Sequence, residues 1–293
     1  MDDATTTFNR LRPRLQGIAY RMLASSAEAE DVVQDVWLRW HDADKAALAS
    51  AEAWLVTTTT RLSIDRLRAA KVRRDHYVGF WLPEPVLGDG PATPEQTKEL
   101  ADDVSVAFLV MLERLSPESR AAFLLREVFD ADYDEVAAAL GKSEAACRQI
   151  VHRAKAQLKE ERPRKTVASE IQLDLMRRFS EALSHGDFAA LNSMLDENAE
   201  LIGDGGGKVP SFGKVLHGGK RIAQLFYATH RRLGDTQRIE IAVLNGQWAL
   251  LRFFDDVLES AQTYETDGER IVRIHVQRNP DKLVRLAAAF GGC

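Results

Sequence analysis

Hydrophobic and polar positions between residues 132 and 158 predict two short helices joined by a tight turn. In the first helix Val136 and Leu140 lie one helical turn apart, so they share a buried face. Gly141 follows where a left-handed backbone can end a helix, and Ser143 is placed to cap the next one. In the second helix the spacing predicts an inner face made of Cys147, Ile150, Ala154 and Leu158.

The outer face of this second helix is polar and mostly basic. It carries Arg148, Gln149, His152, Arg153 and Lys155. A helix pair with a basic second helix is typical of a helix-turn-helix that enters the DNA major groove. A solvated helical hairpin with ordinary surface charge is the alternative that this segment alone leaves open.

Another helix is predicted just upstream, because Ser116, Pro117 and Glu118 form a typical helix start. The Ser caps the backbone, the Pro occupies the first turn, and the acid faces the positive end of the helix dipole. The apolar spacing that follows predicts a buried side made of Ala122, Phe123, Leu125 and Val128.

Residues 29–40, near the N-terminus, have the pattern of an amphipathic helix. Its predicted buried stripe consists of Val32, Val33, Val36 and Trp40. Facing a partner or water are Asp31, Gln34, Asp35 and Arg39. Alone, such an acidic helix is more often an ordinary surface helix.

Residues 61–74 make a strongly basic strip that only Asp65 opposes. Its basic residues are Arg61, Arg66, Arg68, Lys71, Arg73 and Arg74. Such a strip suits contacts with DNA phosphates, which supply affinity without reading the base sequence.

The segment from 75 to 100 contains four prolines and three glycines, which prevent a continuous helix. Within it, Phe80, Trp81 and Leu82 are unusually apolar for a linker, since large aromatic groups normally need a surface to bury against. Two interpretations stay open: packing on the neighbouring helical domains, or docking on the part of the chain that follows residue 165.

That C-terminal part begins with helical patterns and continues with alternating ones. A first helix has Ile171, Leu175, Phe179 and Leu183 on one face, and further helices are predicted at 188–195 and 220–230. Strands are predicted at 238–244, 248–254, 259–265 and 270–277. Asn245-Gly246 and Asp267-Gly268 are typical of type I′ hairpin turns. This order predicts an α+β domain with a curved sheet wrapped around a helix.

The composition excludes several classes of protein but does not indicate a function. The chain has 293 residues and a net charge of −5, with acids concentrated at 95–103 and 255–269 and bases at 61–74 and 148–165. Cys147 and Cys293 are too far apart in sequence for a CxxC zinc site and do not suggest a disulfide scaffold. The polar N-terminus and the lack of a run of about 20 apolar residues predict a cytoplasmic protein with no membrane partner.

Residues 112–158, LERLSPESRAAFLLREVFDADYDEVAAALGKSEAACRQIVHRAKAQL, resemble the σ4 domain of bacterial extracytoplasmic-function (ECF) sigma factors. Residues 29–40 resemble the σ2 helix with which that family binds core RNA polymerase. LSHGDFAALNSML, at 183–195, is similar to the SnoaL-like branch of the NTF2-like superfamily. WLPEP, DGGGK and NPDKL recur in the ECF subgroup that carries such a C-terminal extension, so the resemblance covers nearly the whole chain.

The resemblance implies a multidomain fold, with two all-α sigma domains followed by an α+β SnoaL-like cone. The implied boundaries are σ2 at 1–74, the linker at 75–101, σ4 at 102–162 and the extension at 168–290. It implies a promoter-specificity factor, regulated in cis by its extension, that is not an enzyme and needs no cofactor or metal. The implied partners are promoter DNA and core RNA polymerase, through its β′ clamp helices and β flap. No anti-sigma factor is required, and the free protein is expected to be a monomer.

The resemblance also assigns residues to each role. The −35 element would be read by Ser143, Glu144, Ala145, Arg148, Gln149, His152, Arg153 and Lys155. The −10 element would be opened by a loop of Thr57, Thr58, Thr59, Thr60 and Arg61, followed by Arg66, Arg68, Lys71, Arg73 and Arg74. Many relatives have Asn where Arg61 stands, so the base contact at this position differs. Core polymerase would be bound by Asp31, Gln34, Asp35, Trp37, Leu38 and Arg39.

Three motifs are expected to make regulatory contacts between domains, with the extension folding back onto the linker and σ2. They are Trp81, Leu82, Pro83, Glu84 and Pro85; Asp204, Gly205, Gly206, Gly207 and Lys208; and Asn279, Pro280, Asp281, Lys282 and Leu283. The glycine run is not a phosphate-binding P-loop, because Val209 and Pro210 replace the Ser or Thr and the helix. A plain flexible loop or a ligand loop remains possible there, as does an exposed C-terminal turn at 279–283.

Two other functions for the extension stay open. An enzyme of the cyclase or isomerase type would need an acid or base in the cone, and the candidates are Asp204, His217, His230 and His275. A small-molecule sensor would use the same cavity without chemistry.

Overall fold

The structure is a computed structural model that describes residues 3–74, 77–88, 104–159 and 167–290, with only the backbone described at 3, 71–74, 159 and 235. The chain forms two compact units. One contains residues 1–75 and 111–162, and the other contains residues 76–110 and 163–293. The linker segment that precedes residue 89 therefore belongs to the same unit as the C-terminal domain.

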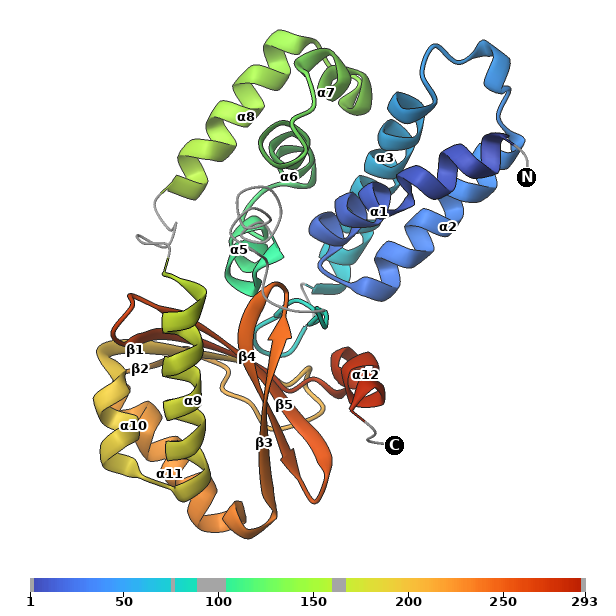
Figure 1. Cartoon of the computed structure of the whole chain (residues 1–293). Helices are drawn as coiled ribbons and strands as arrows, with labels where there is room; N and C mark the ends of the chain where they lie inside the picture. Colours follow the sequence, from blue (N-terminus) through green and yellow to red (C-terminus); the bar gives the residue numbers. More distant parts are fainter. Residues whose placement is uncertain (1–2, 75–76, 89–103, 160–166, 291–293) are drawn as a thin grey trace. The chain divides into compact units, whose positions relative to one another are not determined.

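The N-terminal part of the first unit is a helical bundle (Figure 1). It consists of α1 (Asp3–Leu23), α2 (Ser26–Asp42), the short η1 (Lys45–Ala47) and α3 (Ala51–Arg74). Ser25 caps α2 by accepting a hydrogen bond from the backbone of Glu28. The predicted stripe of α2 is confirmed, since Val32, Val33, Val36 and Trp40 are all buried.

The predicted loop at Thr57–Arg61 is wrong, because α3 runs through it without a break. Thr59 and Thr60 are fully buried, and the hydroxyl of Thr59 donates to the carbonyl of Leu55 at 2.8 Å. This bond to the preceding turn lets a β-branched polar residue stay inside a buried helix. The sequence at this point also lacks the Gly or Pro that would end a helix.

The C-terminal part of the first unit contains the predicted helix-turn-helix. Its elements are α6 (Pro117–Phe123), the π-helix η4 (Leu124–Val128), α7 (Tyr133–Leu140) and α8 (Glu144–Lys159). The preceding helix, α5 (Val106–Leu112), has most of its residues in the second unit. Gly141 has φ 63°, and Ser143 accepts from the backbone of Ala146 at 3.3 Å, as the sequence predicts. The inner faces shift slightly from the prediction: Ala139 and Val151 are buried, while Leu140 and Ile150 are only half-buried.

The C-terminal domain begins with α9 (Ser169–His185) and α10 (Phe188–Met194) and contains a six-stranded sheet. The sheet order is β2-β1-β6-β5-β4-β3. The remaining elements are β1 (Leu195–Asp204), β2 (Leu216–His217), α11 (Gly219–Leu233), η5 (Gly234–Thr236), β3 (Gln237–Leu244), β4 (Gln247–Phe254), β5 (Val257–Thr266), β6 (Ile271–Gln277) and α12 (Pro280–Ala289). The pair β1–β6 is parallel and the other pairs are antiparallel.

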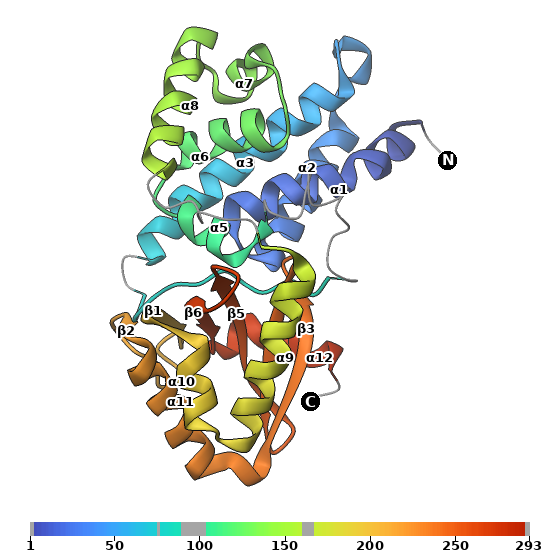
Figure 2. The ribbon, with the colours of Figure 1, turned by 60° about the vertical axis from the view of Figure 1, so that its left-hand side comes forward.

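Helices cover both faces of this curved sheet (Figures 1 and 2). α9, α10 and α11 share one hydrophobic core with one face, and α12 packs Leu283 and Leu286 against the other. The predicted architecture, two all-α parts followed by an α+β domain, is confirmed. Among the described helices, none is long and apolar enough to cross a membrane.

Three details of the C-terminal prediction are wrong, and one alternative that the sequence left open is excluded. Strand β1 was not predicted, and Ile171 is 49% exposed instead of buried. Residues 279–283 are not an exposed turn, because Asn279 caps α12 and Pro280 begins it. Asp267 lacks the positive φ of a type I′ turn, whereas Asp255 and Asp256, between β4 and β5, both have it.

Candidate functional site

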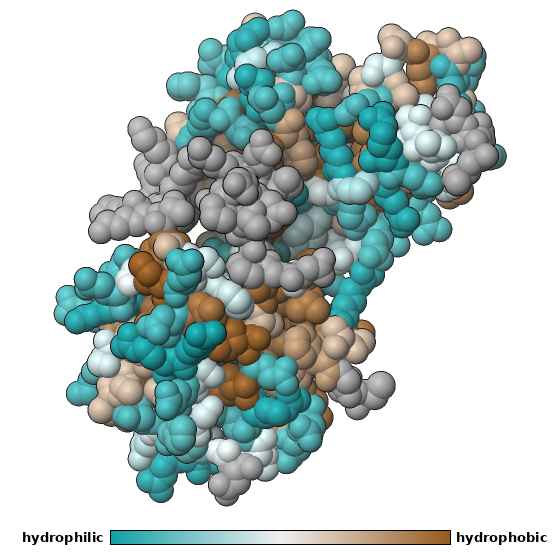
Figure 3. All heavy atoms as spheres, viewed as in Figure 1, coloured by the Kyte–Doolittle hydropathy of each residue, from teal (hydrophilic) through white to brown (hydrophobic). Residues whose placement is uncertain are grey.

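The exposed side of α8 carries the residues predicted to read DNA. Ser143, Glu144, Ala145, Arg148, Gln149, His152, Arg153 and Lys155 are all exposed. Figure 3 shows mostly hydrophilic residues over α7 and α8. Arg148 pairs with Glu144 at 2.6 Å and lies 4.4 Å from the centre of the Tyr133 ring, while Lys155 pairs with Glu127 at 2.7 Å. In the described part of the chain, Arg153 has no ion-pair partner, so it can reach a phosphate or a base without breaking a contact.

The outward side of α2 is linked to the basic strip of α3. The guanidinium of Arg66 lies 2.7 Å from Asp35 and 3.5 Å from Asp31. Arg66, a predicted DNA contact, therefore neutralises Asp31 and Asp35, two predicted polymerase contacts. The sequence did not predict this pairing. Of the other predicted polymerase contacts, Leu38 is 56% exposed and Trp37 is half-buried against Phe8. Gln34 and Arg39 are exposed.

The basic strip also contacts the helix-turn-helix. Arg61 donates to the carbonyls of Ala138 (2.6 Å) and Ala139 (3.0 Å), at the negative end of the α7 dipole. Arg68 pairs with Glu118 at 2.7 Å, and Lys142 lies 3.2 Å from the same carboxylate. The hydrogen bond and charge of Lys142, with Arg68, lower the pKa of Glu118. The side chains of Lys71, Arg73 and Arg74 lie outside the described residues.

A buried arginine joins the two halves of this unit. Arg120 of α6 is 1% exposed, and its guanidinium donates to the carbonyl of Met22 and to Glu113, both at 2.8 Å. The carbonyl of Met22 belongs to the last turn of α1, whose carbonyls lack helical donors. Sequence reasoning missed Arg120, because its carbonyl partner is 98 residues away.

In the second unit, one buried carboxylate contacts both the linker and the NPDKL motif. Asp204 is fully buried at the end of β1. It accepts from the hydroxyl of Tyr77 (2.6 Å) and the backbone N–H of Leu82 (2.9 Å), and it pairs with Lys282 at 2.7 Å. Burial and the bond to Asp204 raise the pKa of Tyr77. Asn279 donates to the same hydroxyl at 2.8 Å.

The linker backbone is held along its length. Lys282 donates to the carbonyl of Leu82 at 2.6 Å, and its ammonium lies 4.1 Å from the centre of the Trp81 ring. Gln277 donates to the carbonyls of Leu82 and Pro83, at 3.2 and 3.1 Å. Further along, Asn245 and Val86 exchange two hydrogen bonds. Leu82, Pro83, Glu84 and Pro85 are buried, so this segment binds as part of the domain. We call these contacts the linker-binding site.

The glycine run makes room for this site. A side chain at Gly206, which has φ 62°, would lie 2.4 Å from the amide nitrogen of Asn279. At Gly205 a Cβ would lie 2.3 Å from the carbonyl oxygen of Val209. Lys208 pairs with Asp281 at 2.7 Å on the surface. The DGGGK and NPDKL motifs therefore pack directly against each other, and the glycines are needed for close approach.

Comparison with known proteins identifies the family. Residues 7–73 match the Sigma-70 region 2 family, and residues 105–158 match Sigma-70, region 4. The chain is 34% identical to the ECF RNA polymerase sigma factor SigJ of Mycobacterium tuberculosis, covering 94% of this chain and 91% of SigJ. It is 30% identical to the probable ECF RNA polymerase sigma factor SigI of the same species, covering 99% and 98%. The crystal structure of SigJ superimposes with a TM-score of 0.75 at 30% identity, covering 96% of this chain and 98% of SigJ.

The chain belongs to the ECF RNA polymerase sigma factors. Its helix-turn-helix lies in region 4, and α2 and the basic strip lie in region 2. The linker-binding site lies outside both matched regions, in the part of the chain that the SigJ structure also covers.

Among the described residues, no hydrogen bond or ion pair joins the candidate catalytic residues of this sigma factor to one another. Asp204 is in the linker-binding site, and His217 is exposed beside Glu200 on β1. His230 lies on α11, against Gly186 and Gly234. His275 is buried in β6, where burial lowers its pKa to about 3. No group of three or more His, Cys, Asp or Glu that could hold a metal occurs among the described residues.

Proposed function

We propose that this sigma factor directs core RNA polymerase, in the cytoplasm, to promoters with matching −35 and −10 elements. In this proposal the exposed residues of α8 read the −35 element, and Arg153 makes the first contact because it is unpaired among the described side chains. The outward face of α2, centred on the exposed Leu38, binds the β′ clamp helices. Region 4 as a whole binds the β flap.

The −10 contacts require an exchange of partners. Arg61, Arg66 and Arg68 form hydrogen bonds or ion pairs inside the unit. DNA phosphates would replace these partners. Exposed ion pairs contribute only about 0–1 kcal/mol each, so binding to polymerase and DNA can exchange them.

We further propose that the C-terminal domain regulates initiation in cis, without an anti-sigma factor, by holding the linker. One observation carries this proposal: the fully buried Asp204 binds the linker segment that connects regions 2 and 4. Since both belong to one chain, the effective concentration is high and a modest interface biases the equilibrium. A held linker limits how far regions 2 and 4 can separate on polymerase.

Transcription in vitro tests the proposal. Purified core enzyme is combined with the full-length monomer or with a version that ends at Arg162, on the same promoter. We expect the shortened protein to bind core polymerase and to initiate less efficiently, because the extension also contributes to the open complex. Equal activity of the two proteins at all concentrations would contradict regulation in cis.

A further inference from the structure

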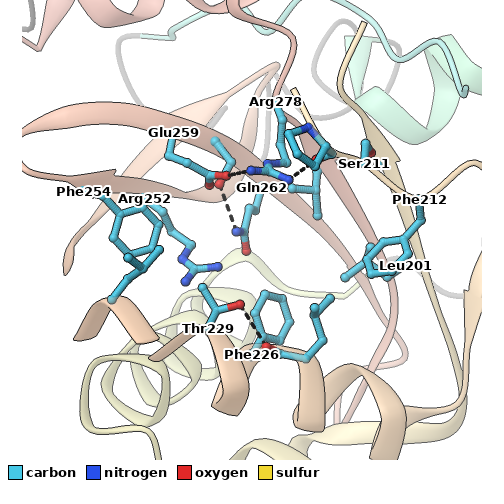
Figure 4. Close-up of a pocket in the computed structure, with 16 residues that line it drawn as sticks. Leu201, Ser211, Phe212, Phe226, Thr229, Arg252, Phe254, Glu259, Gln262 and Arg278 are labelled. Atoms are coloured by element: carbon cyan, nitrogen blue, oxygen red, sulfur yellow. Dashed lines mark hydrogen bonds and ion pairs between the residues drawn. The ribbon is translucent and has the colours of Figure 1, made fainter. Parts of the chain in front are cut away.

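A cavity of about 330 Å³ lies in the C-terminal domain, between the concave face of the sheet and α11 (Figure 4). Its walls are largely apolar, with contributions from Leu201, Phe212, Leu225, Phe226 and Phe254. At roughly 30 Å³ for each water-sized group, the cavity has room for about ten non-hydrogen atoms. These are the properties of a pocket for a small organic molecule.

One charged side chain points into this cavity. Arg252 of β4 is 5% exposed, and Figure 4 shows its guanidinium between the side chains of Phe254 and Phe226. One amino group donates to the side-chain oxygen of Gln237 at 2.7 Å. Its Nε is buried and has no hydrogen-bond partner among the described residues. The rings of Phe226 and Phe254 lie 5.6 and 5.3 Å from the guanidinium carbon.

The other charges in the wall cancel each other. Glu259 forms an ion pair with Arg278, which also donates to the carbonyl of Pro210. The side-chain amide of Gln262 is hydrogen-bonded through both its oxygen and its nitrogen, since it accepts from Tyr264 and donates to Ser260. The described lining therefore contains one cation in excess. Arg252 contacts an amide and aromatic rings, and the charge of Glu259 also favours its charged form, but no described carboxylate forms an ion pair with it. A buried charge of this kind is costly unless an anion completes the site.

We propose that this pocket binds a small monocarboxylic acid with an aromatic or branched apolar body. The carboxylate accepts hydrogen bonds from the guanidinium of Arg252, including the unused Nε–H, in the paired geometry that Arg and carboxylates favour. The apolar body fills the space between Phe212, Leu225 and Phe226. The pocket binds rather than turns over its ligand, because its one described acid, Glu259, is held by Arg278.

The pocket and the linker-binding site share neighbouring residues. Gly203 and Arg278 line the pocket, and the adjacent Asp204 and Asn279 hold the linker. The backbone N–H of Arg278 donates to the carbonyl of Asp204 at 2.8 Å. A carboxylate that attracts Arg278 away from Glu259 would strain this connection and loosen the linker. This coupling rests on the proposed cis regulation, whereas ligand binding does not.

Binding is tested with the full-length protein and three probes of matched size: 4-phenylbutyrate, octanoate and the neutral 4-phenylbutanamide. Calorimetry and thermal unfolding report affinity and ligand-dependent stabilisation. We expect at least one acid to bind and the amide to bind about ten-fold or more weakly, because it lacks the charge that Arg252 recognises. Equal binding of acid and amide, or no binding of either acid at millimolar concentration, would overturn the proposal.

Variants locate the site. Arg252→Met should abolish the preference for the acid, and Arg252→Lys should retain part of it. The matched control is Arg238→Gln, on the neighbouring strand and outside the pocket lining, which should bind like the wild type. If Arg252→Met does not fold, the proposal is still tested by comparing acid and amide binding in the wild type and in Arg252→Lys. If the acid binds but leaves transcription unchanged, the ligand site stands and its coupling to the linker fails.

Discussion

Tyr77 donates its hydroxyl hydrogen to Asp204 at 2.6 Å, across 127 residues of sequence. The same carboxylate pairs with Lys282, so one buried side chain joins the linker to the last helix of the domain. A carboxylate with this many donors holds its partners strongly, because its loss removes one acceptor from the hydroxyl of Tyr77, the backbone N–H of Leu82 and the ammonium of Lys282 together. The linker is therefore a structural part of the C-terminal domain.

Replacing Asp204 by Ala should destabilise the C-terminal domain by about 3 kcal/mol, the usual cost of leaving a partner of a buried ion pair uncompensated. Urea unfolding followed by circular dichroism measures the change. The control is Lys208→Ala, which removes an exposed ion pair with Asp281 and should cost less than about 1 kcal/mol. Similar losses in the two variants would show that Asp204 does not hold the linker.

Arg61 is expected to hold α7 against α3 in the free protein. Arg61→Ala should cost less than about 1 kcal/mol in stability, as expected for a cation at a helix C-terminus. It should nevertheless speed hydrogen exchange of residues 133–140, because the carbonyls of Ala138 and Ala139 lose a donor. Mass spectrometry measures the exchange, with the exposed Arg39→Ala as control. Unchanged exchange in Arg61→Ala would argue against this contact.

How far the sequence predicts the structure depends on how local the signal is. Periodicity and capping residues predicted α7, α8 and the turn at Gly141, since these signals lie within a few residues of one another. Strand β1 was missed because its first half is polar, with Glu197 and Asn198 exposed. The resemblance places Thr57–Thr60 in a loop, but the sequence there has no helix-breaking residue, and the hydroxyl of Thr59 bonds to the preceding helical turn.

The candidate site was predicted only in part, for the same reason. The sequence predicted the three motifs of the linker-binding site, but it did not predict that Asp204 joins them. Asp204 contacts Tyr77 and Lys282 only after the chain has folded. Arg252 was missed although it is the one charged residue in the apolar run from Trp248 to Phe254 of β4. A charge inside such a run indicates a buried cation, but its contacts with Gln237 and Phe226 come from other elements and form only in the folded domain.

The buried His275 should make the stability of the C-terminal domain depend on pH. Burial and, to a lesser extent, the charge of Arg273 lower its pKa to about 3, against about 6.5 in an unfolded chain. Below about pH 6.5 His275 is protonated in the unfolded state but stays neutral in the folded state. Stability should therefore fall as the pH drops from about 6.5 toward 3, by up to about 1.4 kcal/mol per pH unit.

Urea unfolding of wild type and His275→Gln between pH 7.5 and 4.5 measures this contribution. Carboxylates contribute a slope to both proteins, so the difference between the two curves reports the histidine. The exposed His217→Gln serves as control and should follow the wild type. A His275→Gln curve parallel to the wild type would mean that His275 is not held neutral.

On the recognition helix, Arg153→Ala should weaken promoter binding by about 1–3 kcal/mol if the side chain reads a base edge. Arg148→Ala should cost less, because Arg148 must first leave Glu144 and Tyr133. Fluorescence anisotropy of the holoenzyme on a −35 duplex, at several salt concentrations, separates base contacts from phosphate contacts. The exposed Arg178→Ala, in the C-terminal domain, is the control. Wild-type binding by both α8 variants at every salt concentration would rule out the assignment.

Loosening the linker without removing the domain should raise transcription. Deletion from Asn279 onward removes the Lys282 and Asn279 contacts, but it also removes Leu283 and Leu286 from the core that α12 shares with the sheet. Lys282→Met is the sharper change, since it breaks the contacts with Asp204 and Leu82 and leaves α12 in place.

We expect Lys282→Met, and the deletion if it stays soluble, to initiate more transcripts than the wild type in vitro. Removal of the whole extension should lower the yield, because the restraint and the contribution to the open complex are lost together. The control is Asp281→Asn, which removes the exposed pair with Lys208 and keeps the contacts of Lys282 with Asp204 and Leu82. Lower activity in Lys282→Met, at a melting temperature close to that of the wild type, would mean that the held linker promotes initiation rather than restrains it.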